Sequence, residues 1–189
     1  MTVEQRALVE QARDGDHDAF STLVLARVIR LDAAARLILR DRDLAQDAIQ
    51  DAMLRAWHDL PGLRNPDKFD AWLRRLTVHA CIDVARKRRR RSIEVELDPL
   101  DLPAVADSTR AIAQRDLVDR ALAVLEPEWR AIVVLHFYLG MPLPEVAGTL
   151  GIPVGTAKSR LHRSLALLRA SVGTSGGEAL ATLREGQTA

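Results

Sequence analysis

Residues 144–169 read PEVAGTLGIPVGTAKSRLHRSLALLR, and this stretch divides into a short helix, a turn and a longer helix. Residues 144–150 form the short helix, and Gly151-Ile152 supplies the turn. Pro153 opens the second helix, which runs to Arg169, because a proline in the first turn of a helix leaves no hydrogen bond unmade. This arrangement is typical of the helix-turn-helix motif.

The second helix of this motif has an apolar side and a polar side. At 100° per residue, its inner face carries Val154, Ala157, Leu161, Leu165 and Leu168. Hydroxyl and basic side chains gather on the outer side, where a guanidinium can bind guanine if the helix enters the major groove of DNA. The sequence therefore predicts DNA contacts from Thr156, Lys158, Ser159, Arg160 and Arg163. The alternative is an ordinary helical hairpin with a solvated face.

Composition restricts the fold class. The chain has 189 residues, of which 48% are hydrophobic and 4% aromatic, which favours an all-α protein with room for two small domains. Cys81 is the only cysteine, so the chain forms no internal disulfide. The longest apolar runs are far below the ~20 residues of a membrane span, and no signal pattern is visible. We therefore expect a cytoplasmic protein without membrane insertion.

The net charge of +1 hides a strong segregation of charge along the chain. Residues 61–91 carry ten basic and three acidic side chains, a local net charge of +7. Residues 92–109 carry five acidic side chains, no basic one and two prolines, and are predicted to be an acidic linker. The chain is thus predicted to contain two small helical domains, residues 1–91 and 110–170, followed by a mobile tail over residues 171–189.

The basic block coincides with a long helix predicted from Phe69 to about Arg91. Its inner face carries Phe69, Trp72, Leu73, Leu76, Ala80 and Val84, opposite Arg74, Arg75, Arg86 and Arg89. Six consecutive bases close this helix at residues 86–91, where positive charge also suits the helix dipole. Six basic side chains are more than the helix dipole requires for its stabilisation. Contact with phosphates is therefore favoured over a solvated helix end.

A second charged feature is an acidic stripe formed by Asp43, Asp47 and Asp51. It lies on a helix predicted to begin with Asp43 as its N-cap, whose core face carries Ile49, Ala52, Met53, Ala56 and Leu60. Such a stripe is usually a solvated face, although carboxylates also serve acid–base catalysis and metal binding. No nucleophile motif, glycine-rich loop or histidine at ligand spacing accompanies it, so no enzyme, metal site or cofactor is expected.

Over about residues 5–170 the chain resembles the extracytoplasmic-function group of bacterial RNA polymerase sigma factors. Residues 151–163 are similar to the promoter-reading helix of that group, and similar residues precede them at Leu125, Pro127, Arg130, Gly140, Glu145 and Ala147. A second stretch is similar to the helix with which that group binds polymerase, and its matching residues are Asp47, Gln50, Asp51, Leu54, Arg55, Ala56 and Trp57. A third stretch, residues 69–73 with Ile82-Asp83, is similar to the helix that faces the melted promoter in that group. Two ordered modules are stronger evidence than one motif.

The resemblance implies a dissociable specificity subunit that binds core RNA polymerase, directs it to promoters and helps to open the duplex. It implies polymerase contacts from Asp47, Gln50, Asp51 and Arg55, and contacts of the recognition helix with the −35 element. Contacts with the −10 element are implied for Arg64, Lys68, Arg74, Arg75, His79, Arg86, Lys87, Arg88 and Arg89, with a flipped base held by the loop of residues 62–68. The implied partners are promoter DNA, core RNA polymerase and an anti-sigma factor.

Two alternatives remain at this level. An autonomous transcription regulator would use the same helix-turn-helix without polymerase, but the chain has no recognisable ligand-binding or phosphoacceptor domain. A metal-dependent or hydrolytic enzyme lacks a recognisable site. Co-purification with core polymerase separates the sigma factor from both.

Overall fold

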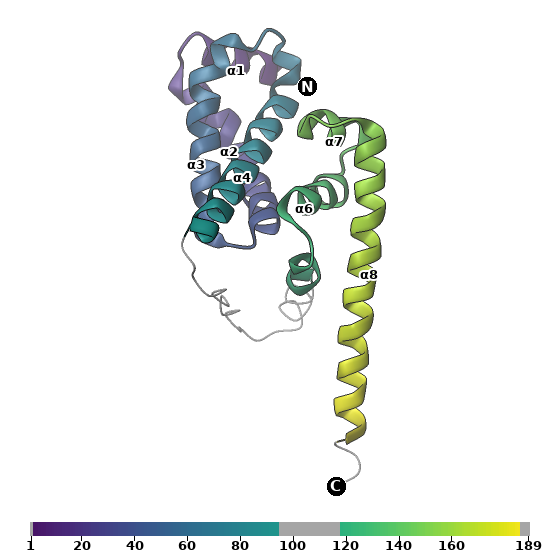
Figure 1. Cartoon of the computed structure of the whole chain (residues 1–189). Coiled ribbons are helices and arrows are strands. Elements are labelled where there is room, and N and C mark those ends of the chain that lie inside the picture. The colour runs from purple at the N-terminus through teal and green to yellow at the C-terminus, as the bar shows by residue number, and fades with distance from the viewer. Residues whose placement is uncertain (1, 95–117, 186–189) are drawn as a thin grey trace.

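The computed structural model describes residues 2–94 and 118–185, with side chains described for residues 2–91 and 118–171. The described residues form helices and turns, and the predicted all-α fold is confirmed (Figure 1). The main helices are α1 (Val3–Arg13), α2 (His17–Leu39), α3 (Arg42–Asp59), α4 (Phe69–Glu94), α6 (Pro127–Val133), α7 (Leu143–Leu150) and α8 (Val154–Glu185). Shorter elements are the 3-10 turns η1 (Leu60–Gly62) and η2 (Pro66–Lys68), the π-helical turn η3 (Val134–Tyr138) and a short helix over residues 118–123.

Aspartate side chains fix where α2 and α3 begin. Asp16 caps α2 by accepting hydrogen bonds from two backbone amides in its first turn. Asp41 caps α3 in the same way, accepting from the backbone amides of Asp43 at 3.1 Å and Leu44 at 3.0 Å. The prediction of Asp43 as the N-cap is therefore wrong, because the free amides of the first turn point back to Asp41.

Two of the described helices are long. α2 runs from His17 to Leu39, since residues 17–39 contain neither glycine nor proline. α8 continues to Glu185, so the predicted loss of regular structure after Arg169 is wrong. Glycines in this region each cost a helix about 1 kcal/mol, but without a proline the helix can still propagate.

The predicted acidic linker lies almost entirely outside the described residues. Its first three residues, 92–94, continue α4 beyond the predicted end at Arg91. The last four residues of the predicted tail, 186–189, also lie outside the described part of the chain.

Helices α1 to α4 form a bundle around an apolar core that includes Leu23, Ile38 and Phe69. On α4, the predicted inner residues Phe69, Leu73 and Ala80 are buried, and Trp72, Leu76 and Val84 are partly buried against the core. The pattern missed four further buried residues of α4, namely Thr77, Val78, Cys81 and Ile82. They are buried because α4 packs on more than one side, against α2 and α3 and also against α6 and α7.

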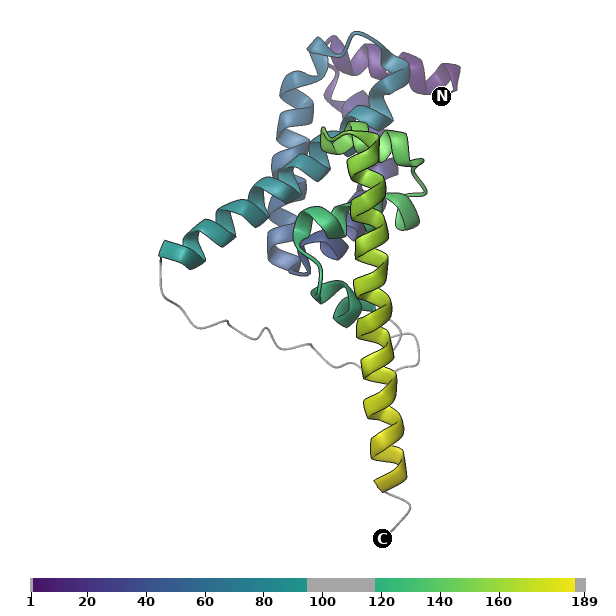
Figure 2. The same ribbon diagram turned by 45° about the vertical axis from the view of Figure 1, so that its right-hand side comes forward.

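The second half of the chain packs directly onto this bundle. α6 contacts α2 and α4, and α7 contacts α4, so both lie alongside the first four helices (Figure 2). One continuous cluster of buried side chains includes Ile38 and Ile82 from the first half and Ile132, Leu135 and Val146 from the second. Residues 2–94 and 118–185 are called the first and second modules below, and the apolar and polar contacts between them are called the seam.

The buried thiol of Cys81 provides a test of the core. Burial raises its pKa to about 12 and outweighs a backbone hydrogen bond that lowers it. At pH 8, about 10⁻⁴ of such a thiol is ionised, whereas roughly a quarter of a solvated thiol is ionised. We therefore expect the native chain to react with iodoacetamide at least ~1000-fold more slowly than the chain unfolded in urea. Equal rates in the two states, followed by mass spectrometry, would show that Cys81 does not lie in the core.

Candidate functional sites

The turn before α8 sets the direction of the recognition helix. Gly151 ends α7 at φ 65°, a left-handed conformation that glycine adopts without strain, and its amide bonds back to carbonyls of α7. Ala147 of α7 and Ala157 of α8 are both buried, so the two helices pack closely at small side chains. This geometry leaves the opposite side of α8 facing solvent, as a helix-turn-helix requires.

The residues predicted to read the −35 element divide into two groups on α8. Lys158, Ser159 and Arg163 are exposed, whereas Thr156 and Arg160 are half-buried. The Ser159 hydroxyl donates a hydrogen bond of 3.0 Å to the backbone carbonyl of Thr156. Arg163 is therefore the arginine of the predicted set that is most available to a base edge.

The inner face of α8 differs from the predicted face at two positions. Val154 is 48% exposed, although the pattern places it inward, because it is the first residue of the helix and precedes the packing contact at Ala157. Ser164 is fully buried, with a hydroxyl that has no hydrogen-bond partner among the described residues. Leu161, Leu165 and Leu168 are partly buried, in agreement with their predicted place on the inner face.

The basic residues predicted to contact the −10 element differ in exposure and in their partners. Arg64, Lys68, Arg75 and Lys87 are exposed and make no ion pair with the described residues. Arg74 is half-buried, and its Nε atom is buried without a partner in the described part of the chain. Arg64, Lys68, Arg75 and Lys87 are thus the members whose surroundings leave the predicted phosphate contacts open.

Other members of that set contact the second module across the seam. The Nε2 atom of His79 lies 2.8 Å from the backbone carbonyl oxygen of Thr149 in α7. Arg86 Nε donates to Glu128 Oε1 at 3.3 Å, and Arg89 Nη1 lies 3.8 Å from Glu126 Oε2. These three basic groups therefore have protein partners where phosphates were predicted.

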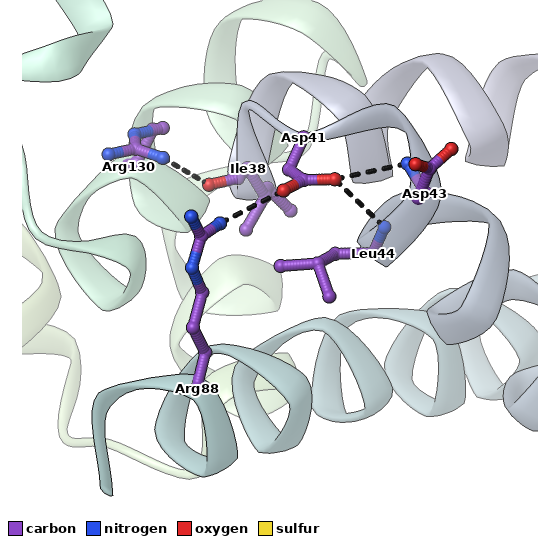
Figure 3. Close-up of polar contacts among 6 residues, drawn as sticks. All are labelled: Ile38, Asp41, Asp43, Leu44, Arg88 and Arg130. Carbon is purple, nitrogen blue, oxygen red and sulfur yellow. Dashed lines mark hydrogen bonds and ion pairs between the residues drawn. The ribbon is translucent and has the colours of Figure 1, made fainter. Parts of the chain in front are cut away.

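Arg88 contacts the first module instead (Figure 3). Its Nη1 atom donates to Asp41 Oδ2 at 3.0 Å, while the other oxygen of the same carboxylate caps α3. Arg88 thus links the end of α4 to the beginning of α3, which gives this predicted DNA-binding residue a structural contact.

A buried arginine joins the two modules close to this contact. Arg130 on α6 is 6% exposed and donates hydrogen bonds to the backbone carbonyls of Leu122 at 2.9 Å, Leu125 at 2.6 Å and Ile38 at 2.5 Å. The bond to Ile38 is visible in Figure 3 and reaches the last turn of α2 in the first module. The pKa of Arg130 is lowered to about 10, mainly by burial, with nearby Arg40 adding to the shift and Glu126 opposing it.

The residues predicted to bind polymerase occupy one side of α3. Asp47 and Gln50 are exposed, and Leu54 on the same side is 71% exposed. Asp51 is half-buried and pairs with Arg55 at 2.7 Å, and Arg55 also contacts Asp83 of α4 at 3.4 Å. Asp47 is thus a free surface carboxylate, whereas Asp51 belongs to a network that links α3 to α4.

Two other kinds of site were searched in the described part of the chain. No group of three or more histidine, cysteine, aspartate or glutamate side chains there is placed to hold a metal ion. No described helix is both long enough and apolar enough to cross a bilayer.

Comparison with known proteins matches the two parts of this chain to two known families. Residues 23–91 match the Sigma-70 region 2 family, and residues 115–168 match the Sigma-70, region 4 family. The RNA polymerase sigma-E factor of Streptomyces avermitilis is 36% identical over 166 residues, which cover 88% of this chain and 92% of that protein. The ECF RNA polymerase sigma factor SigM of Mycobacterium tuberculosis is 38% identical over 160 residues, 84% of this chain and 80% of that protein. The chain belongs to the extracytoplasmic-function group of the sigma-70 family.

Solved structures of other sigma factors have the same architecture. The structure of CnrH in complex with the cytosolic domain of CnrY is 30% identical to this sigma factor, covers 90% of this chain and 97% of CnrH, and has a TM-score of 0.66. RpoE of Bartonella quintana, in complex with the anti-sigma factor NepR, has the same TM-score at 24% identity and supports the fold. The matched segment 23–91 lies within the first module of this sigma factor, and all but the first three residues of the segment 115–168 lie within the second.

Leu54, already part of the resemblance to the polymerase-binding helix, lies on the same face of α3 as Asp47 and Gln50. The structure adds two further candidate residues to the predicted sites of this sigma factor. Glu126 and Glu128 contact the basic end of α4, which lies far earlier in the chain. No local sequence pattern could reveal that pairing.

Proposed function

We propose that this sigma factor binds core RNA polymerase, directs it to specific promoters through the −10 and −35 elements, and promotes initiation of transcription. The observation that carries the proposal is the presence of regions 2 and 4 in order on one chain, each with an exposed basic surface. A helix-turn-helix alone would also suit an autonomous regulator. Region 2 favours the sigma factor, because a DNA-binding regulator has no need of a polymerase-binding module.

The two DNA elements are assigned to different modules. For the −35 element, the proposed contacts are Lys158, Ser159 and Arg163, with Thr156 and Arg160 at the edge of the surface. For the −10 element, Arg64, Lys68, Arg75 and Lys87 are available as the structure stands. Because runs of basic side chains neutralise phosphates without reading bases, the first set is expected to determine sequence preference.

Further partners and the cellular location follow from the same proposal. CnrH is bound to the cytosolic domain of CnrY in its structure, and RpoE to the anti-sigma factor NepR, which supports an anti-sigma factor as a partner here. We infer that this sigma factor acts in the cytoplasm together with polymerase. It is proposed to act by binding alone, without catalysis and without a cofactor.

Charge reversal on α3 tests polymerase docking. We expect Asp47→Arg to weaken binding to core polymerase by about 5- to 10-fold. The substitution replaces an exposed carboxylate at the proposed interface by a positive charge, which a basic surface on polymerase would repel. Asp47 is chosen in place of Asp51 because it lies outside the network with Arg55. The measurement is fluorescence anisotropy of the labelled chain titrated with core polymerase.

The matched control is Asp14→Arg, which makes the same charge change at the C-cap of α1, outside the face of α3 that carries Asp47 and Gln50. An equal loss of affinity for core polymerase in both variants would show that the effect comes from net charge alone. Unchanged binding by Asp47→Arg would remove the docking assignment.

Co-elution tests the proposed function as a whole. The purified chain and core polymerase are expected to elute together from gel filtration as a stoichiometric complex in the absence of DNA. A chain that binds promoter fragments but elutes separately from core polymerase would be an autonomous regulator.

A further inference from the structure

Residues 62–68, which connect α3 to α4 and are called the α3–α4 loop below, have a defined shape. The apolar residues that anchor the loop and its two ends are buried, namely Leu60, Pro66 and Phe69. The backbone amides of Asp67 and Lys68 donate to the side chain and the backbone carbonyl of Asn65, at 2.9 Å and 3.0 Å. These two hydrogen bonds close the turn η2 within the loop.

The α3–α4 loop displays charged side chains to solvent. Arg64 and Lys68 are exposed and make no ion pair with the described residues, and both are proposed to contact the −10 element. Because η2 ends at Lys68 and α4 begins at Phe69, no residue separates the loop from the helix. The position of the loop therefore depends on where the first turn of α4 lies.

A largely buried arginine of α2 holds that first turn. The side chain of Arg27 is 15% exposed, and its Nε atom forms an ion pair with Oδ1 of Asp70, the second residue of α4. Its Nη1 atom donates to the backbone carbonyl of Leu23 at 2.7 Å. Its guanidinium carbon lies 5.3 Å from the centroid of the Phe69 ring, a contact that adds cation–π attraction. One guanidinium thus ties α2 to the first two residues of α4.

This contact differs in strength from the other ion pair near the loop. Arg6 of α1 lies 3.9 Å from Asp67, but both side chains are more than half exposed, so water and salt weaken their attraction. Arg27 is instead held in one geometry by three partners. Asp70 without Arg27 would still suit the positive end of the helix dipole, because it lies in the first turn of α4. Removing Arg27 should therefore loosen this turn without preventing the helix from forming.

We propose that Arg27 is a positioning residue for promoter binding, which holds the α3–α4 loop so that Arg64 and Lys68 meet the −10 element in a fixed geometry. The proposal rests on the proposed function for the identity of the DNA. A loop that is already ordered loses less conformational entropy on binding than a loose loop with the same charges. Arg27 acts through Asp70 and Phe69 and does not itself contact DNA.

Hydrogen exchange in the free full-length chain tests this role without DNA or polymerase. Arg27→Met keeps the apolar stem, and the matched control Arg42→Met removes the same charge from an exposed residue of α3 that makes no ion pair with the described residues. We expect the amides of residues 63–70 to exchange about 5- to 20-fold faster in Arg27→Met than in the control. Amides in the middle of α3 should change less, because a general loss of stability would speed exchange there by the same factor.

Three further variants separate the ion pair from the packing of the arginine stem. Arg27→Lys keeps the charge but not the planar fork that reaches both Asp70 and Leu23, so it should restore only part of the protection. Asp70→Asn removes the other partner at a half-exposed position and serves the same measurements if Arg27→Met does not fold. Arg27→Met/Asp70→Asn should lose no more protection than Arg27→Met alone, because both changes break one contact.

Promoter opening connects the position of the loop with function. Core polymerase is combined with each variant and mixed with a duplex promoter that the native chain opens, and unpaired thymines are detected by permanganate. We expect Arg27→Met to open this promoter about 5- to 20-fold more slowly than Arg42→Met. On a template that is already open across the −10 element the difference should be much smaller, because strand separation no longer depends on capture by the loop.

Two results would overturn the proposal. One is an unchanged exchange rate at residues 63–70 in folded Arg27→Met, which would show that the loop keeps its shape without Arg27. The other is equal opening by Arg27→Met and Arg42→Met, or an equal loss on duplex and pre-opened templates, which would show that Arg27 does not act through the loop. Failure to form a complex with core polymerase would instead contradict the proposed function, and hydrogen exchange would still decide whether Arg27 positions the loop.

Discussion

Replacing Arg130 with methionine lowers the free energy of unfolding by about 3–5 kcal/mol, the largest effect expected for a single substitution in this chain. The apolar stem is kept, but the carbonyls of Ile38, Leu122 and Leu125 lose the guanidinium as a donor, and that of Leu122 keeps the backbone amide of Leu125. Each buried group left without a partner costs about 1–3 kcal/mol, and the three losses are not fully additive. Urea denaturation followed by circular dichroism gives the change directly.

Two comparisons make this result specific. Arg120→Met removes an equal charge from an exposed position of the helix over residues 118–123 and is expected to change stability by less than about 0.5 kcal/mol. Arg130→Lys keeps the charge but replaces the planar fork by a single ammonium, so it should restore only part of the loss. A loss below about 1 kcal/mol in Arg130→Met would contradict the three buried hydrogen bonds.

The pH dependence of this difference has a defined sign. Burial lowers the pKa of Arg130 to about 10 in the folded chain, well below the usual value of an arginine side chain. Below about pH 9 the guanidinium is charged in both states, so we expect the stability difference between the native chain and Arg130→Met to be independent of pH there. Above about pH 10 the folded chain loses this proton while the unfolded chain still holds it, so the cost of burying the charge is relieved as the pH rises.

The second large effect is expected at the recognition helix. Arg163→Ala should reduce transcription from a promoter with its matching −35 element by about 5- to 150-fold, since a bidentate arginine contact discriminates between bases by about 1–3 kcal/mol. Transcription from a pre-opened template that depends on the −10 element should be unchanged. The exposed position of Arg163 makes it a stronger candidate than half-buried Arg160.

Arg169→Ala is the matched control for this variant. Arg169 is also exposed on α8 but lies beyond the first turns that would enter the groove. Loss of transcription on both templates by Arg163→Ala would indicate misfolding of the second module. No loss on either template would move base recognition to Lys158 and Ser159.

Local features of the fold could be predicted from sequence because their causes are local. The inner face of α4 at Phe69, Leu73 and Ala80 follows from helical spacing alone. The turn at Gly151 follows from the need for a left-handed residue after α7. The pairing of Asp51 with Arg55 was also available from sequence, because residues four apart on a helix are neighbours.

The seam could not be predicted, because its contacts join residues that are distant in sequence and often involve backbone carbonyls. The hydrogen bond from Arg30 to Tyr138 spans 108 residues, and the one from Arg130 to Ile38 spans 92. A carbonyl is present at every residue, so no composition or spacing marks the one that is used. The same reason explains why His79, Arg86 and Arg89 were assigned to DNA without their protein partners.

Run-off transcription over a library of promoters is the most direct test of the central claim that this chain is a promoter-selecting subunit of RNA polymerase. Core polymerase alone and core polymerase with the purified chain are compared on the same library, and the transcripts are sequenced. The account predicts transcripts that require the chain and start downstream of shared −35 and −10 sequences. Identical transcripts with and without the chain, obtained with core polymerase that a known sigma factor activates, would contradict it.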